Sequence, residues 1–398
     1  MHKAILPLML SCAAMLTACN DSNTPATPAN QASTVAVIGD SPYGTTPTDD
    51  AQFLKYPAFI SAINLDSAVS LVLHAGDTHS GKQYCTEAYD SSIYSQWTAF
   101  KAPLVYTPGD NEWADCHKAK EGGGTYNAVT GAIDYKVDAN GNYIDYAGGN
   151  PVANLDLVRS MYFASPGRAF GVTLDVHSQG LEYDPAHPTD KNYVENVWGK
   201  KSGVLFVTLN IPGGSNNDTD PWYGAPAMSL TQAQEVASRS AANLRWLDTA
   251  FKRATADGVS AVVIMEQADM WDLDGNVPAH IAQYKQFVDS IAAHTTAFGK
   301  PVLLLNGDSH VFRSDNPLVS AAPCVSEPSP GATAVACSDD AYANQPNGYN
   351  VPNFHRVVVH GSTFPLEWLK LGIDPAASAA NGAYAFGPFS WQRMQPTL

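Results

Sequence analysis

The chain has 398 residues, of which 45% are hydrophobic and only 15% are charged. This apolar content is typical of a folded globular protein and excludes a largely disordered one. The formal net charge of −16 argues against nucleic acid or an anionic membrane surface as a partner. An acidic protein that handles an anionic substrate needs a local source of positive charge, and a bound divalent metal is one such source.

The N-terminus predicts export and lipid anchoring. His2 and Lys3 give a short positive start, and residues 4–15 form an apolar run that is too short to span a bilayer as a helix. The run ends in Leu16-Thr17-Ala18-Cys19, which resembles a lipobox, so residues 1–18 are a predicted lipoprotein signal peptide and Cys19 the lipidation site. Asn20 after the cysteine favours the outer membrane of a bacterial cell envelope. An ordinary signal peptide with a chance cysteine is the alternative.

Residues 19–33 are rich in Pro, Ala, Asn and Thr and predict a flexible tether, which makes the lipid the only membrane contact. Residues 34–398 predict a single α/β domain with two surface insertions, at about 118–150 and 315–350. The first insertion contains Asn140-Gly141, a strong hairpin signal, and the second is heavy in Pro, Ala and Ser. We find no internal repeat.

Short β-branched and apolar runs alternate with helical patterns along this domain. The clearest helix is predicted over residues 230–253, where Ala, Leu and Trp recur every three or four positions. Continuous apolar strands between helices predict sheets that are buried on both faces. The predicted strands are residues 34–38, 69–74, 104–106, 204–209, 261–265, 302–305 and 356–359.

Four of these strands are followed closely by a glycine–aspartate pair. The pairs are Gly39-Asp40, Gly76-Asp77, Gly109-Asp110 and Gly307-Asp308. One such pair is weak evidence, because aspartate also caps helices and glycine serves turns. The carboxyl ends of strands in an α/β sheet converge, however, and four aspartates gathered there repel one another unless a cation lies between them. The pattern therefore predicts a metal centre, with four independent helix caps as the alternative.

In order and spacing these pairs resemble the motifs of the calcineurin-like metallophosphoesterases, from Ile38 to His310. The resemblance implies a four-layer fold, a two-sheet mixed β-sandwich flanked by helices, and metal-dependent hydrolysis of a small phosphorylated substrate. It also implies two overlapping ligand sets. Asp40, Asp77 and His310 would hold one ion. The second set would share Asp77 and add Asp110, Gln267 and Asp308, with Asp269 nearly as well placed as Gln267.

The sequence departs from that family at several positions. Pro42 stands where the family has a histidine ligand, and Asn111 where it has the catalytic histidine. Asp110, Gln267 and Asp308 also replace nitrogen or amide ligands, which leaves oxygen donors alone at the second position. Oxygen donors suit Mg²⁺, Mn²⁺ or Ca²⁺ better than Zn²⁺. We therefore expect one or two ions of this kind, with a weak or empty first position.

The loss of the catalytic histidine leaves the proton transfer to other groups. We expect Asn111 to orient the phosphate, and His79, His117 or Glu112 to assist the leaving group. His360 is a further candidate because it ends the last predicted strand. Lys82 or Arg313 would contact a phosphate oxygen, and Trp113 or Trp271 would wall the cleft.

Four cysteines remain once Cys12 in the signal peptide and the lipidation site Cys19 are set aside, an even number that is typical of an oxidising compartment. Three pairings are possible. We favour Cys85–Cys116 and Cys324–Cys337 because the partners of each pair are close in sequence. A structural zinc site is the alternative, but no paired C-x-x-C spacing supports it.

Two other functions remain open from the sequence. Ile38-Gly39-Asp40-Ser41 resembles the nucleophile block of the GDSL serine esterases, but the only D-x-x-H segment is Asp184 to His187, in mid-chain. The lost ligands are also consistent with a degenerate, non-catalytic phosphoesterase fold that binds a cation or a surface ligand.

Overall fold

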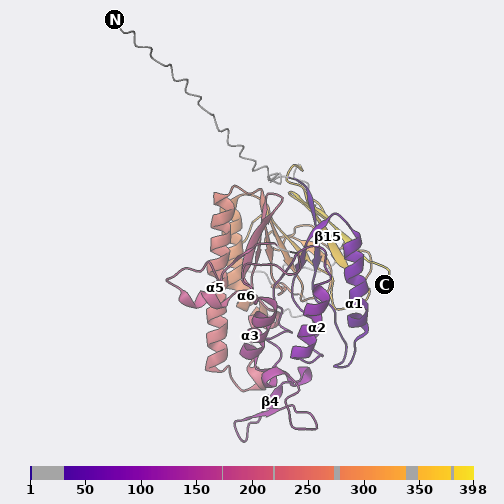
Figure 1. Ribbon diagram of the computed structural model, residues 1–398, viewed down its shortest axis with the longest axis vertical. Helices are drawn as coiled ribbons and strands as arrows, with labels where there is room; N and C mark the ends of the chain where they lie inside the picture. Colours follow the sequence, from indigo (N-terminus) through magenta and orange to yellow (C-terminus); the bar gives the residue numbers. More distant parts are fainter. Residues whose placement is uncertain (2–30, 173, 218–219, 273–277, 338–347, 378–380) are drawn as a thin grey trace.

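The computed structural model describes residues 1, 31–172, 174–217, 220–272, 278–337, 348–377 and 381–398. The predicted signal peptide, the lipidation site Cys19 and most of the tether lie outside these residues. Figure 1 shows two β-sheets packed face to face, with helices on both outer faces. The predicted mixed α/β fold is therefore confirmed. Among the described residues, no helix is both long and apolar enough to cross a membrane.

The smaller sheet has six strands, in the order β16-β17-β15-β1-β2-β3. Strands β1, β2 and β3 run parallel, and β15 pairs antiparallel with β1. The predicted bounds of the second and third strands are reproduced by β2 and β3. The strands are β1 Ser33–Ile38, β2 Val69–His74, β3 Leu104–Tyr106, β15 Trp368–Ile373, β16 Ala385–Phe386 and β17 Phe389–Met394.

The larger sheet has nine strands, in the order β13-β12-β11-β14-β10-β9-β8-β7-β6. Its central strands β14, β10, β9 and β8 are parallel. The strands are β6 His177–Ser178, β7 Val197–Lys201, β8 Val204–Thr208, β9 Ala261–Met265, β10 Val302–Asn306, β11 Arg313–Asp315, β12 Val325–Ser326, β13 Val335–Ala336 and β14 Phe354–Val358. Part of the predicted second insertion thus extends this sheet through β12 and β13.

Successive side chains of a strand point to opposite faces of its sheet, and this alternation explains the four layers. In β1, Val35 and Val37 face the larger sheet, while Ala36 and Ile38 face the helices on the outside. Every residue from Val35 to Ile38 is buried, which is why these strands appear as continuous apolar runs in the sequence. The main core therefore lies between the sheets, and a second and third apolar layer lie under the helices.

Helices α1, α2 and α3 cover the smaller sheet, and α5 and α6 cover the larger one (Figure 1). Helix α5 contains the predicted helix and begins where the Ser229 side chain accepts a hydrogen bond from the backbone N–H of Gln232. The helices are α1 Ala51–Leu65, α2 Glu87–Trp97, α3 Pro151–Tyr162, the short α4 Gly213–Asn216, α5 Leu230–Ala256 and α6 Pro278–Phe298, with 3-10 turns at Ala119–Glu121, Tyr146–Gly149, Pro188–Asn192 and Trp222–Gly224.

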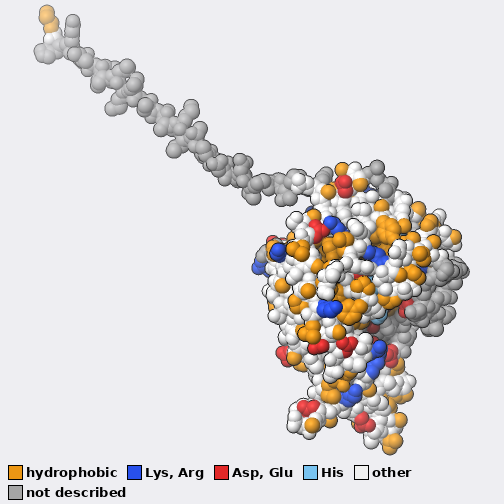
Figure 2. All heavy atoms as spheres, turned by 90° about the vertical axis from the view of Figure 1, so that its right-hand side faces the viewer, with side chains coloured by type: hydrophobic (Ala, Val, Ile, Leu, Met, Phe, Trp, Pro, Cys, Tyr) orange, Lys and Arg blue, Asp and Glu red, His pale blue; other side chains and the backbone are white. Residues whose placement is uncertain are grey.

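The first predicted insertion forms a projection at the end of the molecule opposite the N-terminus (Figure 1). Figure 2 shows it from the side, with acidic and basic side chains on its surface. Its hairpin pairs β4 (Gly124–Tyr126) with β5 (Ile133–Tyr135). The turn at Asn140-Gly141 follows, where a single antiparallel bridge joins Val137 to Tyr143.

Candidate metal centre

The loops that leave the parallel strands of both sheets meet at one edge of the sandwich. Asp40 follows β1, Asp77 follows β2, and Asp308 and His310 follow β10. These four residues have positive φ angles of 48°, 59°, 74° and 62°. Aspartate and histidine adopt this region more readily than most residues, at some cost in conformational energy. The loops therefore use a costly backbone conformation at four of the predicted ligand positions.

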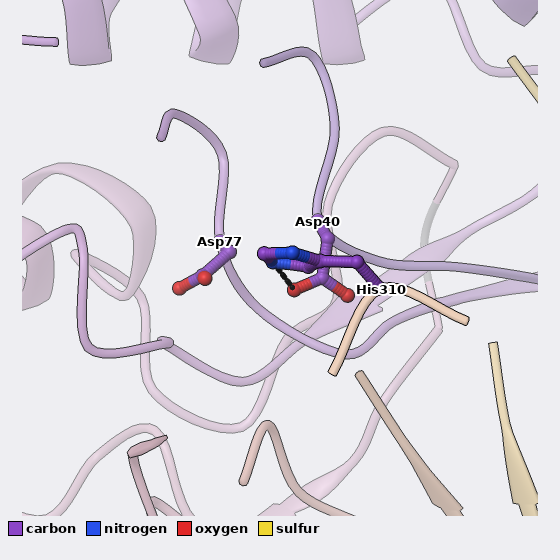
Figure 3. A group of neighbouring side chains, drawn as sticks. All are labelled: Asp40, Asp77 and His310. Carbon is purple, nitrogen blue, oxygen red and sulfur yellow. Dashed lines mark ion pairs between the residues drawn. The ribbon is translucent and has the colours of Figure 1, made fainter. Parts of the chain in front are cut away.

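Asp40, Asp77 and His310 form a compact group, with one potential ligand atom from each lying within 4.8 Å of the others. Figure 3 shows the imidazole of His310 directed towards the carboxylate of Asp40, with Asp77 close by. His310 Nε2 lies 3.5 Å from Asp40 Oδ1. Both aspartates are buried, whereas the histidine side chain is 39% exposed. The two buried aspartates therefore form one side of the group, which we call the acidic floor, and the side at His310 is open to solvent.

This group fits a divalent cation. Asp40 Oδ2 is buried and has no hydrogen-bond partner among the described residues. Burial, together with the nearby charges of Asp110 and Glu112, raises the pKa of the carboxyls of Asp40 and Asp77 well above their usual range. A buried carboxylate with a free oxygen is costly unless a cation accompanies it.

The second predicted group is organised differently. Gln267 follows β9, and its side-chain Nε2 donates to Asp110 Oδ1 at 3.1 Å and to Asp77 Oδ2 at 3.3 Å. Its Oε1 accepts the backbone N–H of Gly213 at 2.5 Å. Burial raises the pKa of Asp110 to about 7. Asp308 accepts a hydrogen bond from the backbone N–H of Asp269 at 2.9 Å, so Asp269 contacts this group through its backbone.

Tyr43 is a residue of the centre that the sequence reasoning missed. Its hydroxyl donates to Asp77 Oδ2, and Asn111 Nδ2 donates to the same hydroxyl at 2.9 Å. Its ring packs edge-on against His310, with centroids 5.2 Å apart. Tyr43 directly follows Pro42, the position that departs from the family motif. No local sequence pattern marks it, because its role depends on contacts with residues far along the chain.

Asn111 and Glu112 both have structural partners. Asn111 Nδ2 donates to Tyr43 and, at 2.7 Å, to Asp77, so both amide hydrogens are engaged. Glu112 accepts the backbone N–H of Thr78 at 2.9 Å, that of Gly109 at 3.1 Å and the hydroxyl of Tyr106 at 2.8 Å. Glu112 therefore ties the second and third ligand loops together.

The two candidate histidines have different surroundings. His79 is fully buried, packs edge-on against Tyr89 and directs Nδ1 to the carbonyl of Ser80 at 3.2 Å. His117 Nδ1 accepts the backbone N–H of Tyr223 at 2.9 Å, which leaves the proton of the neutral ring on Nε2. Nε2 has no partner among the described residues.

His117 also belongs to a second acidic group. One potential ligand atom of His117 lies within 4.8 Å of one from Asp115 and one from Asp220. Lys118 already pairs with both aspartates, at 2.6 Å and 3.1 Å. A lysine therefore compensates this group, unlike the group around Asp40.

The predicted substrate contacts are placed as follows. Lys82 is exposed, whereas Trp113 is fully buried beneath the guanidinium of Arg239. Arg313 is buried and donates to Asp315 at 2.9 Å. Trp271 is buried against Arg356, and His360 pairs with Glu327. Among these residues, Lys82 alone is exposed.

The structure contains both predicted disulfides, Cys85–Cys116 and Cys324–Cys337. Cys85 and Cys116 are buried, and their sulfurs lie 3.3 Å and 3.5 Å from the backbone carbonyl of Asn111. This bridge therefore braces the loop that carries Asp110 and Asn111. Two disulfides in one chain are typical of proteins outside the cytoplasm.

No protein-family model matches the chain, and no curated protein matches it. Among solved structures it is similar to a purple acid phosphatase from seeds of yellow lupin (Lupinus luteus). The two chains are 11% identical, with a TM-score of 0.38, and the match covers 86% of this chain and 49% of the lupin protein. The chain thus matches about half the length of that protein.

Proposed function

We propose that the protein is a metal-dependent phosphoesterase that hydrolyses small phosphate esters through a metal-activated water. The observations that carry this proposal are the convergence of Asp40, Asp77 and His310 and the burial of Asp40 Oδ2 without a hydrogen-bond partner among the described residues. Imidazole suits Zn²⁺, but two of the three ligands are carboxylates, and on this majority of oxygen donors we propose Mg²⁺, Mn²⁺ or Ca²⁺. Zinc that stays at one equivalent through dialysis would contradict this choice of metal.

The chain's own groups define what the site does. A bound divalent cation would polarise phosphoryl oxygens and lower the pKa of a water. Tyr43 and Asn111 both donate to Oδ2 of Asp77, which holds this carboxylate in one orientation. The acidic floor repels a phosphate as long as no cation is present. Binding of the substrate should therefore depend strictly on the metal.

Three residues supply functions that the acidic floor lacks. A Cβ built on Gly81 would lie 3.0 Å from Asn111 Oδ1 and 3.4 Å from Lys120 Nζ, which puts this largely exposed ammonium beside the site. We assign Lys120, with Lys82, to the phosphate oxygens. His117 holds its proton on an unpartnered Nε2, and we assign it to the leaving group.

The test is hydrolysis of an aryl phosphate by the purified protein after chelation and readdition of Mg²⁺, Mn²⁺, Ca²⁺ or Zn²⁺. We expect activity that disappears on chelation, returns with a hard cation and is absent in Asp77→Ala. Asp156→Ala is the control, because this side chain is 69% exposed on α3. Absence of turnover with every cation, combined with intact metal binding, would favour the non-catalytic alternative.

The serine-esterase alternative has a separate test. Ser41 is 4% exposed, and the Asp184 and His187 of the only D-x-x-H segment lie in an exposed loop. A nucleophilic serine must be reachable by its substrate and by a general base. We expect no labelling of Ser41 by a fluorophosphonate probe and full phosphatase activity in Ser41→Ala.

We further propose that the protein acts in the bacterial cell envelope, anchored through lipidated Cys19. The lipobox-like segment before Cys19 supports this, and so do the two disulfides. Radiolabelled palmitate should be incorporated into the wild-type protein and not into Cys19→Ser. Outer-membrane placement is tested by density fractionation of the envelope.

A further inference from the structure

The side chain of Gln267 occupies the place where a second ion of the proposed centre would lie. Gln267 is fully buried, and its Cβ and Cγ pack against the turn at Gly76. Its amide reaches between Asp77 and Asp110, which come from neighbouring strands of the smaller sheet. A metal at this position would need an oxygen lone pair from Gln267, as the sequence-based expectation assumed.

The orientation of this amide is fixed by the backbone. The N–H of Gly213 can only donate a hydrogen bond, and Gln267 Oε1 accepts it at 2.5 Å. Rotating the amide by 180° would place its NH₂ against that N–H and its oxygen against two carboxylates. Both contacts would be repulsive, and a buried N–H left without an acceptor costs about 1–3 kcal/mol. Nε2 therefore faces the carboxylates.

The donors around Asp77 agree with this orientation. Asp77 Oδ2 accepts hydrogen bonds from Tyr43, Asn111 and Gln267. This oxygen has no lone pair left for a metal on the side of Asp110. Among the described residues, Asp77 Oδ1 accepts one hydrogen bond, from the backbone N–H of Asn111 at 3.3 Å, so this oxygen keeps a lone pair for an ion.

We infer that the centre holds a single cation, bound by Asp40, Asp77 and His310, and that the Gln267 amide takes the place of the second ion. This inference rests on the proposed function and specifies its metal content. The amide links Asp77 and Asp110 through its two hydrogens, as a bridging cation would through its charge. Asp110 and Asp308 are then acceptors within a hydrogen-bonded wall and do not bind metal.

The number of bound ions tests this inference without an activity measurement. Full-length protein is stripped with chelator and titrated with Mn²⁺, which is followed by calorimetry and electron paramagnetic resonance. We expect one Mn²⁺ per chain with the spectrum of an isolated ion. Gln267→Glu keeps an acceptor for Gly213 and replaces the donor by a second carboxylate oxygen. It should bind two Mn²⁺ and show a spin-coupled signal. Gln392→Glu, exposed on β17, is the charge-matched control and should bind one.

Anomalous scattering from manganese-soaked wild-type crystals gives an independent count that does not depend on any variant. One peak beside Asp40 is expected, with none between Asp77 and Asp110. Two ions in the wild-type protein would overturn the single-ion inference and leave the phosphoesterase proposal standing. One ion in both the wild type and a folded Gln267→Glu would refute the role given to Gln267. No bound ion at all would refute both proposals.

Discussion

Asp308 donates its backbone N–H to Asp40 Oδ1 at 3.0 Å, which links a loop of the larger sheet to a loop of the smaller one. Asp40 follows β1 and Asp308 follows β10, so the hydrogen bond closes the edge of the sandwich at the proposed metal centre. Asp77 comes from the smaller sheet and His310 from the larger one. A cation bound by all three ligands would therefore hold the two sheets together at this edge.

Metal binding should consequently stabilise the whole fold. A ligand that binds only the folded state at 100 times its dissociation constant adds about 2.7 kcal/mol to the free energy of unfolding. We expect Mn²⁺ to raise the melting temperature of the wild-type protein and to leave that of Asp40→Asn nearly unchanged. Without metal, Asp40→Asn should be at least as stable as the wild type at pH 7, because burial raises the pKa of the Asp40 carboxyl. A similar manganese-induced shift in both proteins, measured by calorimetry, would contradict the ligand role of Asp40.

The two disulfides should differ in their effect on the metal. The loop-entropy model gives a contribution of about 3–4 kcal/mol for the Cys85–Cys116 bridge, with a separation of 31 residues, and about 3 kcal/mol for Cys324–Cys337, with 13. Both double alanine variants should therefore unfold at lower urea concentrations. Only the loss of Cys85–Cys116 should weaken Mn²⁺ affinity, since this bridge packs against Asn111. Equal affinities in the two variants would show that the bridge does not position the ligand loop.

Glu112 should act on loop structure and not in proton transfer. Each carboxylate oxygen of Glu112 accepts one backbone N–H, so the NH₂ in Glu112→Gln leaves one of these two N–H groups without an acceptor, and we expect a loss of about 1–3 kcal/mol in stability. Turnover should fall while the pH profile of kcat keeps its shape. Loss of one limb of that profile would instead identify Glu112 as the acid or base. Glu87→Gln, exposed in the first turn of α2, is the control.

Asp90 should make the protein less stable as the pH rises. Burial and the charges of Glu112 and Glu87 raise its pKa to about 8, compared with about 3.9 in the unfolded chain. The folded state then binds the proton more tightly, so the wild type loses stability as the pH rises from 4 to 8.

Asp90→Asn removes this dependence and should exceed the wild type by up to about 5 kcal/mol at pH 8, because each unit of difference in pKa corresponds to about 1.4 kcal/mol, and by little at pH 4. Urea unfolding at both pH values measures the difference. A constant offset between the two proteins across this range would mean that Asp90 is ionised in both states. Asp156→Asn, at an exposed position of α3, should follow the wild type.

The sequence predicts the fully buried strands better than the partly exposed ones. A strand buried on both faces along its whole length, such as β9, appears as an unbroken apolar run with the predicted bounds. β15 and β17 were missed because Lys370 and Gln392 interrupt their apolar residues. These positions are partly or fully exposed, so each strand alternates and lacks a continuous run.

Within the candidate centre, too, the sequence predicts some residues and not others. The four aspartates and His310 are predictable from motif order, because each directly follows a strand in the sequence. The place of Tyr43 and the direction of the Gln267 amide are not, because they depend on contacts with Asp77 and Gly213 that only the folded chain creates. Residue identity alone therefore suggested an oxygen ligand where the fold presents a hydrogen-bond donor.

The glycines that surround the carboxylates set a limit on how this centre can change. A Cβ on Gly109 would overlap the carboxylate of Asp77, and one on Gly307 would overlap that of Asp40. A Cβ on Gly361 would lie 2.4 Å from Asp40 Cβ, and one on Gly213 would lie 2.5 Å from Asp308 Oδ1. No other residue type fits these four positions while the aspartates stay in place. A side chain of the centre can be replaced by another that fits the same space, but a glycine at these four positions cannot. Distant relatives of this protein should therefore be traceable by the spacing of these glycines even where every metal-binding residue differs.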